Sequence, residues 1–496
     1  MKQITVFVLR LVLIYLIILF YAWTTTVGTF KFYPKNNNYN LLSIAFLHGQ
    51  LNLPVQVPKA LLKLSDPYDP ILNKESRMMG IHDFSLYNKK LYLYFGATPA
   101  LILFIPYKLI TKKIMPYNMA IFIFSTGILI WSFLILLHLK KKYFNSIPEW
   151  FVFLSTLIIG IANGVAVLLR RPDMYEVAIA SGCFFLTGAI YFLCLSINNP
   201  SLLKLFIAGL FLGFSVGSRP HFVFSGICLI LLFCFYFRKS GFNHVFKLFA
   251  TLAIPFSFIV FLILLYNYFR FGNIFEFGVK YQLAGMNSHL YSLFGLKNIL
   301  GKIHLTLYCA PSLSPTFPFI YPKFWMPPSP PFPPGETTPE RVAGLIPSVP
   351  FVLLLLIGPL CEILLRLFNK TKELIEIIFP IREFLIILIP GLINLFFLFL
   401  YTGSVLRYNV DFFNYFILAS ILIWFYFDRF LNKNGITRNF LRIFALMFGI
   451  VSILNGISYS ILGSCNDFRS VDPEQFHRIK SYFKPVSDFL YLILKQ

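Results

Sequence analysis

The stretch ITVFVLRLVLIYLIILFYAW, residues 4–23, has a single charged residue, Arg10, in an otherwise largely apolar run. A helix of about 20 apolar residues is long enough to cross the hydrocarbon core of a bilayer. The run is too long for a removable signal peptide and lacks a small-residue cleavage site. It therefore predicts a retained signal anchor.

Similar runs recur along the whole chain, which has 496 residues, 57% of them hydrophobic and only 13% charged. A soluble domain of this size needs more polar surface than that composition supplies. Backbone polar groups inside lipid must pair within their own segment, so the spans are expected to be helices. The sequence thus predicts an all-α polytopic membrane protein. We expect spans near residues 5–25, 117–138, 150–169, 174–196, 203–218, 220–238, 246–267, 344–367, 382–402, 409–430 and 440–463.

The distribution of basic residues predicts the topology. The net charge of +23 comes mainly from clusters at span ends, such as Lys140–Lys142, which set orientation and contact anionic lipid headgroups rather than nucleic acid. The strong clusters all fall inside only if the apolar piece 91–110 lies in the interface or dips in and returns. This gives about 11 transmembrane helices (about 10 to 13), with the N-terminus inside and the C-terminus outside. If 91–110 crosses, the later loops invert, and Lys108, Lys112 and Lys113 favour that alternative.

We expect a transmembrane domain over residues 1–463 with two long outer loops and an outer tail. The first loop, 26–90, should hold amphipathic helices and a small hairpin. The second, 268–343, is proline-rich at 327–340 and should be extended there. The tail, 464–496, contains an amphipathic segment that could rest on the membrane.

Arginine occurs beside several outer span ends, where positive charge is disfavoured. A guanidinium group suits bidentate binding of phosphate. The set therefore predicts a site for a lipid-linked phosphate, with Arg171, Arg219, Arg270 and Arg407 as its ligands. The alternative for each arginine is that it snorkels to water or caps a helix.

Acidic residues are scarce, with only 20 Asp and Glu in the chain, and several lie at the predicted outer face. A sugar transferase needs one carboxylate as a general base for the acceptor hydroxyl. The candidates are Asp83, Asp69 and Asp66. Asp66 and Asp69 each precede a proline and could instead cap turns. Asp83 follows His82, just before an alternating LYLYF segment that could form a hairpin arm.

Other polar and aromatic residues at this face are candidates for substrate binding. Asp173 and Glu176 share one helical face by their spacing, and they could also belong to a structural ion-pair network. Outward tyrosines could stack on sugar rings or simply pack. The predicted substrate-binding set is Asn38, Tyr39, His82, Asp173, Glu176, Tyr408 and Asp411.

The histidines and cysteines show no metal-binding pattern. His48, His82, His221 and His289 lack zinc spacing, so no metal is assigned to them. Whether a divalent cation takes part is left open. Of the seven cysteines, most lie inside apolar runs. Cys309 and Cys465 could face outward and could pair, although nothing in the sequence requires it.

The order of these features resembles the glycosyltransferase C (GT-C) superfamily. The chain has one span, a long outer loop opening with YNLLSIAFLHGQLNLP, many spans with short links, and a late RY..D motif. The loop-one pattern also resembles that of uncharacterised bacterial membrane proteins near that superfamily. It is carried here by Tyr39, Asn40, Ala45–Leu47, Gly49–Leu51, Asp66–Pro70, His82–Tyr87 and Tyr92–Gly96, and the late motif by Arg407, Tyr408 and Asp411.

The resemblance implies an enzyme that takes a sugar from a polyprenyl-phosphate donor and passes it to a cell-envelope glycan or lipid. The bilayer, the donor and the acceptor would be its partners, and the site would face outward from a bacterial cytoplasmic membrane. Family members usually carry an acid just after the first span, where this chain has Asn36–Asn38. Either another acid has taken that role or catalysis is not retained. A lipid-linked glycan transporter or polymerase, and a non-catalytic envelope protein of the same fold, are the alternatives.

Overall fold

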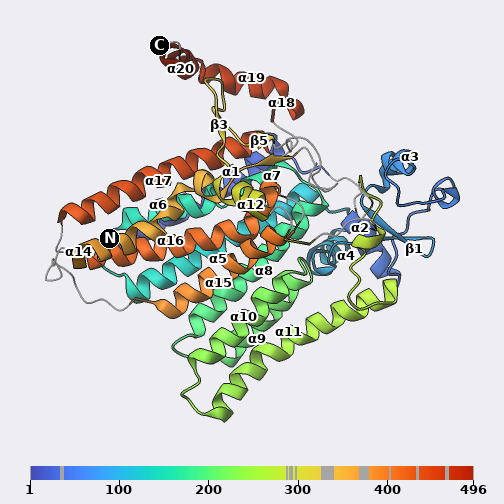
Figure 1. Ribbon diagram of the computed structural model, residues 1–496, viewed down its shortest axis with the longest axis horizontal. Coiled ribbons are helices and arrows are strands. Elements are labelled where there is room, and N and C mark those ends of the chain that lie inside the picture. The colour runs from blue at the N-terminus through green and yellow to red at the C-terminus, as the bar shows by residue number, and fades with distance from the viewer. Residues whose placement is uncertain are drawn as a thin grey trace.

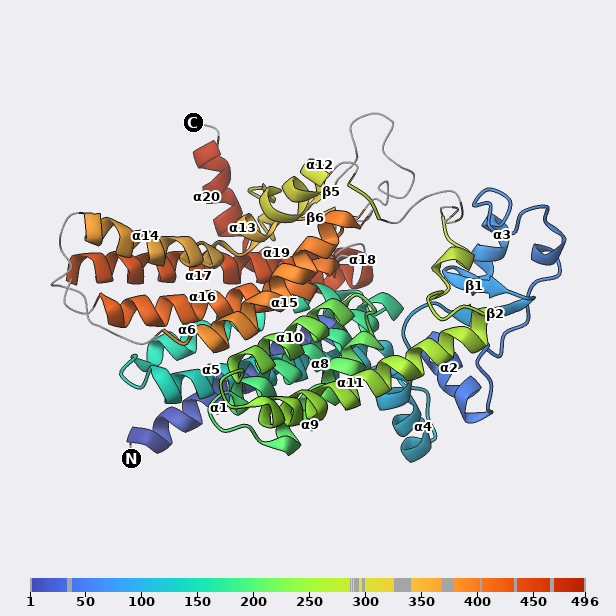
Figure 2. The ribbon, with the colours of Figure 1, turned by 60° about the horizontal axis from the view of Figure 1, so that its bottom comes forward.

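The computed structural model describes a mostly helical protein. The described residues are 2–33, 38–285, 287, 289, 294–296, 299–324, 340–367, 379–401, 404–431, 435–463 and 468–494. The helices form an elongated bundle, and loop one, the segment predicted to be the first outer loop, projects from one end of it (Figures 1 and 2). Asn36, Asn37, Cys465 and nearly all of the proline-rich segment lie outside the described residues.

Among the described residues, seven helices are long and apolar enough to cross a membrane. They identify an integral membrane protein. These helices are α1 (Lys2–Thr26), α5 (Tyr117–Tyr143), α8 (Met174–Ser196), α11 (Phe242–Phe271), α15 (Ile381–Leu400), α16 (Val410–Phe430) and α17 (Gly435–Leu462). Four more predicted spans contain shorter helices, namely α6 (Glu149–Ile161), α9 (Leu202–Val216), α10 (Phe222–Tyr236) and α14 (Leu354–Leu367).

Two predicted spans are interrupted. The span expected at 150–169 is divided into α6 and α7 (Val165–Arg170), because Gly164 between them has a left-handed φ of +82°. The span expected at 344–367 consists of α13 (Leu345–Ser348), a 3₁₀ turn at Pro350–Leu353 and α14. Pro350 has no N–H to continue a helix from α13.

The segment between α1 and α5 leaves the bundle and rejoins it at the same end. Thr25 Oγ1 donates to the carbonyl of Asn118 at 3.4 Å, and Asn40 Nδ2 donates to that of Met115 at 2.9 Å. The piece at 91–110 forms the end of a strand, a π turn at Ala100–Phe104 and the short helix α4 (Ile105–Thr111). This path fits an interfacial placement of 91–110, while the total number of crossings and the orientation stay predictions.

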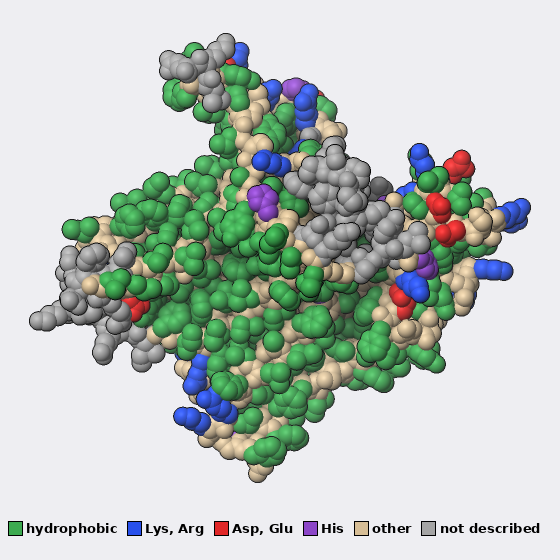
Figure 3. Space-filling view, viewed as in Figure 1, with side chains coloured by type: hydrophobic (Ala, Val, Ile, Leu, Met, Phe, Trp, Pro, Cys, Tyr) green, Lys and Arg blue, Asp and Glu red, His purple; other side chains and the backbone are tan. Residues whose placement is uncertain are grey.

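Basic residues gather at the opposite end of the bundle, where the half-buried Glu149 and the buried Asp428 hold several of them. Glu149 pairs with Arg10 and Lys140, and Asp428 pairs with Arg438 and Arg442. Figure 3 shows a broad apolar surface over the helices, with Lys and Arg at its lower edge and charges of both signs on the projecting loop. This is the distribution expected of a bundle with a membrane-facing belt.

The first outer loop contains the predicted hairpin. Strands β1 (Phe84–Tyr87) and β2 (Lys90–Leu93) pair in antiparallel register, and Asn88 and Lys89 between them both have positive φ. Two such residues form the type I′ turn that suits a two-residue hairpin. The second outer segment adds to this unit, since Ser85 Oγ donates to the carbonyl of Gly278 at 2.7 Å.

Helix α2 (Asn38–Leu47) is present where an amphipathic helix was expected, but its buried face is partly polar. Asn40 and Ser43 are both buried, and Asn40 bonds both the N–H and the carbonyl of Met115. The helix is therefore fastened into the loop by hydrogen bonds as well as by apolar contact. The loop also contains the short helix α3 (Lys74–Ser76).

The remaining elements are short. Helix α12 (Ile299–Ile303) and the strand pairs β3–β4 (Ser312–Leu313, Ile320–Tyr321) and β5–β6 (Lys323–Phe324, Arg341–Val342) follow the hairpin unit. The tail forms α18 (Phe468–Val471), α19 (Pro473–Tyr482) and α20 (Lys484–Leu494). Phe468 stacks on Trp23 of α1 with ring centroids 5.3 Å apart, which ties the tail to the bundle. Its contact with a membrane remains a prediction.

A close backbone approach joins loop one to the bundle. A Cβ atom on Gly96 would lie 1.9 Å from the carbonyl oxygen of Gly217, just after α9. We therefore expect Gly96→Ala to cost about 1–3 kcal/mol through overpacking. Thermal unfolding in detergent measures this loss. Gly301→Ala in α12 is the matched control, because a Cβ atom on Gly301 would have no other atom within 4 Å. Equal stability of the two variants would contradict the prediction.

Candidate functional site

Asp83 is the acid of loop one that is held most firmly. It begins the hairpin with a left-handed φ of +61°, and its side chain is buried. The carboxylate accepts hydrogen bonds from the hydroxyl of Tyr175 and from Gln282 Nε2, the latter at 2.8 Å. His82 Nε2 lies 3.5 Å from the same carboxylate. Strained backbone and a buried acid are features that occur often at functional sites.

Burial raises the pKa of Asp83 above its ordinary value. The charge of His82, the Gln282 hydrogen bond and the charge of Arg407 act in the opposite direction. A carboxylate with a raised pKa is a stronger base, provided that the pH is high enough to deprotonate it. The environment of Asp83 therefore suits proton abstraction.

The pH dependence of any activity that uses Asp83 as a base follows from this shift. Activity should fall as the pH drops through the pKa of Asp83, above the value of about 3.9 for an exposed aspartate. Gln282→Met removes a hydrogen bond to the charged carboxylate of Asp83, which raises the pKa of Asp83 further. The fall in activity should therefore occur at a higher pH than in the wild type. The measurement is the pH profile of kcat/KM. Gln56→Met, on the exposed part of loop one, is the control and should leave the pH at which kcat/KM falls unchanged.

A second group joins two arginines to two glutamates. Glu340 accepts from Arg407 Nη1 at 2.6 Å through each of its oxygens, and from Arg171 Nη1 at 3.1 Å. Glu176, which is 1% exposed, lies 3.7 Å from Arg171 Nη1 and 3.9 Å from Arg407 Nη1. We call Arg171, Arg407, Glu176 and Glu340 the quartet.

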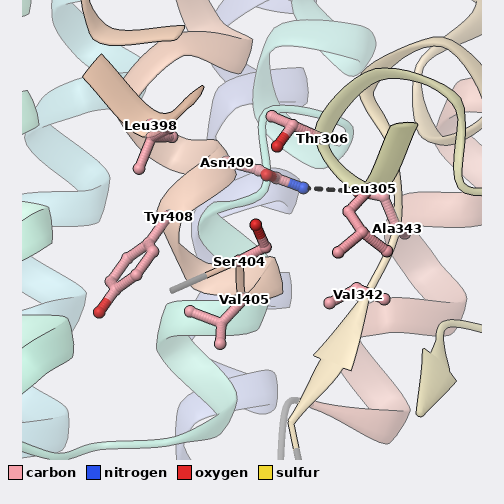
Figure 4. Close-up of a pocket in the computed structure, with 9 residues that line it drawn as sticks. All are labelled: Leu305, Thr306, Val342, Ala343, Leu398, Ser404, Val405, Tyr408 and Asn409. Atoms are coloured by element: carbon pink, nitrogen blue, oxygen red, sulfur yellow. Dashed lines mark hydrogen bonds between the residues drawn. The ribbon is translucent and has the colours of Figure 1, made fainter. Parts of the chain in front are cut away.

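The chain around the quartet is held by backbone contacts. Asn409 Nδ2 donates to the carbonyl of Ala343 at 2.8 Å, which links the turn after Arg407 to the strand after Glu340 (Figure 4). The cavity shown there has a volume of about 10 Å³, enough for about one water molecule. In the same view Tyr408 points away from Val342 and Ala343. This cavity is therefore too small to hold a substrate.

A third group surrounds Asp411, which is fully buried in α16. Its carboxylate pairs with Arg219, and His221 Nε2 lies 3.5 Å from it. The His221 ring stacks on Phe397 with centroids 4.4 Å apart. Arg219 and His221 come from the link between α9 and α10, so Asp411 ties this link to α16.

Two tyrosines connect the three groups. Arg407 lies over the rings of Tyr175 and Tyr408, at 4.8 Å and 5.4 Å from their centroids. Arg171 lies over Tyr175 and Arg219 over Tyr408, at 5.2 Å and 5.4 Å. Since Tyr175 also donates to Asp83, the structure brings together eight of the candidate residues from the sequence. These are His82, Asp83, Arg171, Glu176, Arg219, Arg407, Tyr408 and Asp411.

The other candidate acids of loop one make turn contacts. Asp66 accepts from the N–H of Tyr68 at 2.8 Å and from Asn287 at 3.1 Å, and Asp69 accepts from the N–H of Ile71 at 2.7 Å. These are the bonds of side chains that cap turns, the alternative that the sequence left open. Neither acid has a described contact with the quartet or with Asp83.

Arg270 is engaged by the protein itself. Its Nη1 donates to the carbonyl of Leu93 at 2.6 Å and its Nη2 to Asn267 Oδ1 at 2.7 Å. The guanidinium also lies 3.8 Å from the ring centroid of Tyr266. These bonds fasten the hairpin to α11, so binding of a phosphate would require Arg270 to give up part of them.

The remaining candidates flank the site. Asp173 caps α8 by accepting from the N–H of Met174 at 2.7 Å, and Asn38 Nδ2 contacts the sulfur of Met174. Tyr39 is buried between Phe104 and Tyr117. These three side chains support the start of α8 and the fold of loop one.

Sequence reasoning did not select Glu340, Tyr175 or Gln282. Tyr175 lies between two selected acids, and Glu340 precedes Arg341 at the end of the proline-rich segment. No spacing rule distinguishes them, because their roles depend on contacts between residues far apart in the chain.

An apolar groove on the side of the bundle is lined by Pro220, the residue after Arg219. It has a volume of about 340 Å³ and lies between loop one, the end of α9 and α11. Leu101 and Leu262 in its wall are 49% and 44% exposed, so the groove opens on the lipid-facing surface. Tyr94 lines it, and burial raises the pKa of this tyrosine, on which the charges of Asp83 and Arg407 also act. Tyr94 therefore stands where the groove meets the charged groups.

Comparisons with known proteins found likeness only among solved structures. No protein-family model and no curated protein sequence matches the chain. Two structures of the oligosaccharyltransferase of Archaeoglobus fulgidus resemble it, each at 14% sequence identity. One is tethered to an acceptor peptide (TM-score 0.41, 91% of this chain) and the other, AglB, is in complex with an inhibitory peptide and a dolichol-phosphate (TM-score 0.42, 92%). The matched region spans 56% of the length of each solved chain.

Proposed function

We propose that the protein is a membrane glycosyltransferase of the GT-C type. It would move a sugar from a polyprenyl-phosphate donor to an envelope glycan or lipid on the outer face of a bacterial cytoplasmic membrane. The order of motifs along the chain supports this proposal, and the site geometry supports it independently.

The observation that carries the proposal is the junction of the lipid-facing groove with the charged groups. An isoprenoid chain is apolar and needs a groove that is open to lipid, whereas its phosphate needs cationic hydrogen-bond donors. The groove supplies the first and ends at Tyr94 and Pro220, next to Arg219. Arg171, Arg219 and Arg407 supply the second, and Asp83 supplies a carboxylate.

In the proposed reaction, Asp83 takes the proton of the acceptor hydroxyl as its oxygen attacks the anomeric carbon. The bond between that carbon and the phosphate oxygen breaks, and polyprenyl phosphate leaves with the bonding electrons. Arginine N–H groups stabilise the negative charge that develops on the phosphate. A single displacement of this kind inverts the configuration at the anomeric carbon.

The side chains around Asp83 do not form a set of metal ligands. The described part of the chain contains no group of three or more His, Cys, Asp or Glu side chains arranged to hold a metal ion. The nearest candidate, Asp83, is bonded to an amide and a hydroxyl, and His82 is its only metal-ligating neighbour in the contacts above. The side chains around Asp83 therefore do not fit a divalent cation site.

The proposal is tested by comparing lipid-linked sugars and envelope glycans in cells with and without the protein. Loss of the protein should cause one polyprenyl-phosphate sugar to accumulate and one sugar to disappear from a glycan or lipid. Expression of the wild type, but not of Asp83→Asn, should reverse both changes. An accumulated complete glycan would instead favour the transporter or polymerase alternative, and unchanged pools would favour a non-catalytic protein.

The groove makes a separate prediction about donor length. Ile263→Trp should fill part of the groove and raise KM for a long-chain donor by about tenfold, while a short-chain donor that leaves the groove empty is affected little. Phe261→Trp lies on the same helix, is exposed and does not line the groove, so it is the control. An equal effect on both donors would show that the groove does not hold the chain.

A further inference from the structure

Tyr175 contacts both Asp83 and the two arginines of the quartet. Its hydroxyl donates to the Asp83 carboxylate. The guanidinium carbons of Arg171 and Arg407 lie 5.2 Å and 4.8 Å from the centroid of its ring, which is within the range of a cation–π contact. Asp83 belongs to loop one, Arg171 follows α7 and Arg407 precedes α16. One side chain therefore joins three segments that lie far apart in the sequence.

The orientation of the Tyr175 ring is fixed by its surroundings. Tyr175 lies in the first turn of α8, and Asp173 caps the start of this helix. The buried Phe95, just after β2, meets the Tyr175 ring at an interplanar angle of 90° with ring centroids 5.3 Å apart. This edge-to-face arrangement is a favourable one for two aromatic rings. Packing and two cations thus set the position of the hydroxyl oxygen before any substrate binds.

The Asp83 carboxylate is held through both of its oxygens. Tyr175 donates to Oδ2, and Gln282 Nε2 donates to Oδ1 at 2.8 Å. In an inverting displacement the base and the leaving phosphate stand on opposite sides of the anomeric carbon, so the distance between the base and the phosphate site must be maintained. A misplacement of about 1 Å can cost about 10²-fold in rate. Of these two donors, Tyr175 is the one whose described contacts include the arginines.

We propose that Tyr175 is a positioning residue that sets the distance and orientation of the Asp83 carboxylate relative to the arginines. The inference rests on the proposed function, in which Asp83 is the base and the arginines bind the phosphate. The hydroxyl and the ring of Tyr175 have separate tasks. The hydroxyl aims the carboxylate of the base, and the ring keeps the guanidinium groups in place. Substitutions that remove one or both of these parts should therefore have different effects.

The first test is the transfer kinetics of the full chain in detergent. Tyr175→Phe removes the hydroxyl and keeps the ring, so kcat should fall about tenfold, as for the loss of a hydrogen bond to a charged group, while KM for the donor stays unchanged. Tyr175→Leu also removes the ring, so it should in addition raise KM for the donor about tenfold. Tyr15→Phe, on the exposed face of α1, is the matched control and should change neither constant. In an Asp83→Asn background, Tyr175→Phe should cause no further loss of rate, because the hydroxyl acts through Asp83.

The second test measures the pKa of Asp83 and does not depend on transfer. The probe is the ¹³Cγ signal of aspartate-labelled protein, in which the Asp83 signal is the one absent from Asp83→Asn. Loss of a donor to the charged carboxylate raises the pKa of Asp83, so its signal should titrate at a higher pH in Tyr175→Phe than in the wild type and in Tyr15→Phe. Tyr175→Phe leaves in place the other charged and titratable groups that act on Asp83, namely His82, Tyr94, Asp173 and Arg407.

The outcomes separate this inference from the proposed function. If the wild type transfers sugar but Tyr175→Phe keeps both its kcat and the pKa of Asp83, Tyr175 is not a positioning residue, although the proposed function stands. A Tyr175→Phe protein that loses kcat, KM and unfolding temperature together, with the pKa of Asp83 unchanged, would reduce the role to a structural one and overturn the inference. If the pKa rises in Tyr175→Phe but the wild type transfers no sugar, the inference falls together with the proposed function.

A second variant keeps the inference testable if the changes at Tyr175 prevent folding. Phe95→Leu leaves the hydroxyl of Tyr175 and the carboxylate of Asp83 intact but removes the edge-to-face contact that orients the ring. It should lower kcat in the same direction as Tyr175→Phe. An unchanged kcat in a folded Phe95→Leu protein would show that the orientation of the ring does not matter and would overturn the inference.

Discussion

Replacement of Asp83 by asparagine should lower the transfer rate by about 10²–10⁴-fold, the usual contribution of a general base. Asparagine has nearly the same shape as aspartate, and its side-chain oxygen can still accept from Tyr175 or Gln282, so the hairpin should keep its structure. It has no basic oxygen to take the acceptor proton. The measurement is transfer of a labelled sugar by purified protein, with thermal unfolding as the check on folding.

Asp69→Asn and Asp66→Asn are the matched controls for this prediction. Both acids belong to the same loop and were selected by the same sequence argument, but their contacts are those of turn caps. They should reduce stability slightly and leave the rate of the chemical step within a few-fold of the wild type. Full activity of Asp83→Asn would exclude Asp83 as the base, and loss of activity in Asp69→Asn alone would transfer the role to Asp69.

The second large effect is expected at the pair formed by Arg219 and Asp411. Asp411 is fully buried, and Arg219 is its close ion-pair partner. Arg219→Gln leaves the buried carboxylate with the more distant His221 and the weak thiol donor of Cys183, each about 3.5–3.6 Å away. Removal of one partner of a buried pair typically costs about 3–5 kcal/mol. We expect a marked fall in the unfolding temperature of the detergent-solubilised protein.

The double variant Arg219→Gln/Asp411→Asn should recover much of that stability, because no unpaired charge remains. Its activity then distinguishes two roles of Arg219. If the arginine also contacts the donor, the stable double variant should still show a raised KM. If the arginine serves only the fold, activity should return with stability. A single variant as stable as the wild type would contradict the description of Asp411 as a carboxylate that depends on Arg219.

The sequence predicted the class of the protein because the relevant signals are local. An apolar run such as residues 4–23 is a property of neighbouring residues, and so is the alternation that predicted the hairpin of Phe84–Tyr87 and Lys90–Leu93. The break at Gly164 was missed because glycine also occurs inside helices, and only the left-handed φ shows that it ends one.

The choice among the candidate residues needed the tertiary structure. The sequence made Asp66, Asp69 and Asp83 all candidates, with turn capping as the alternative for the first two. Among the described contacts, only Asp83 accepts hydrogen bonds from Tyr175 in α8 and from Gln282. Arg270 and Arg407 both lie near helix ends, yet Arg270 donates to the hairpin backbone while Arg407 donates to Glu340. Each of these differences comes from a partner more than 60 residues away in the chain.

By itself, therefore, the sequence determined that this chain is a helical membrane protein with polar loops rich in arginine and acid at helix ends. These properties follow from hydropathy and charge, which each short segment carries independently of the rest. Only the tertiary structure decided which arginine faces which acid, and that the lipid-facing groove ends beside them. The reason is that ion pairs and hydrogen bonds act over a few ångströms, and the folding of distant segments against one another sets those distances.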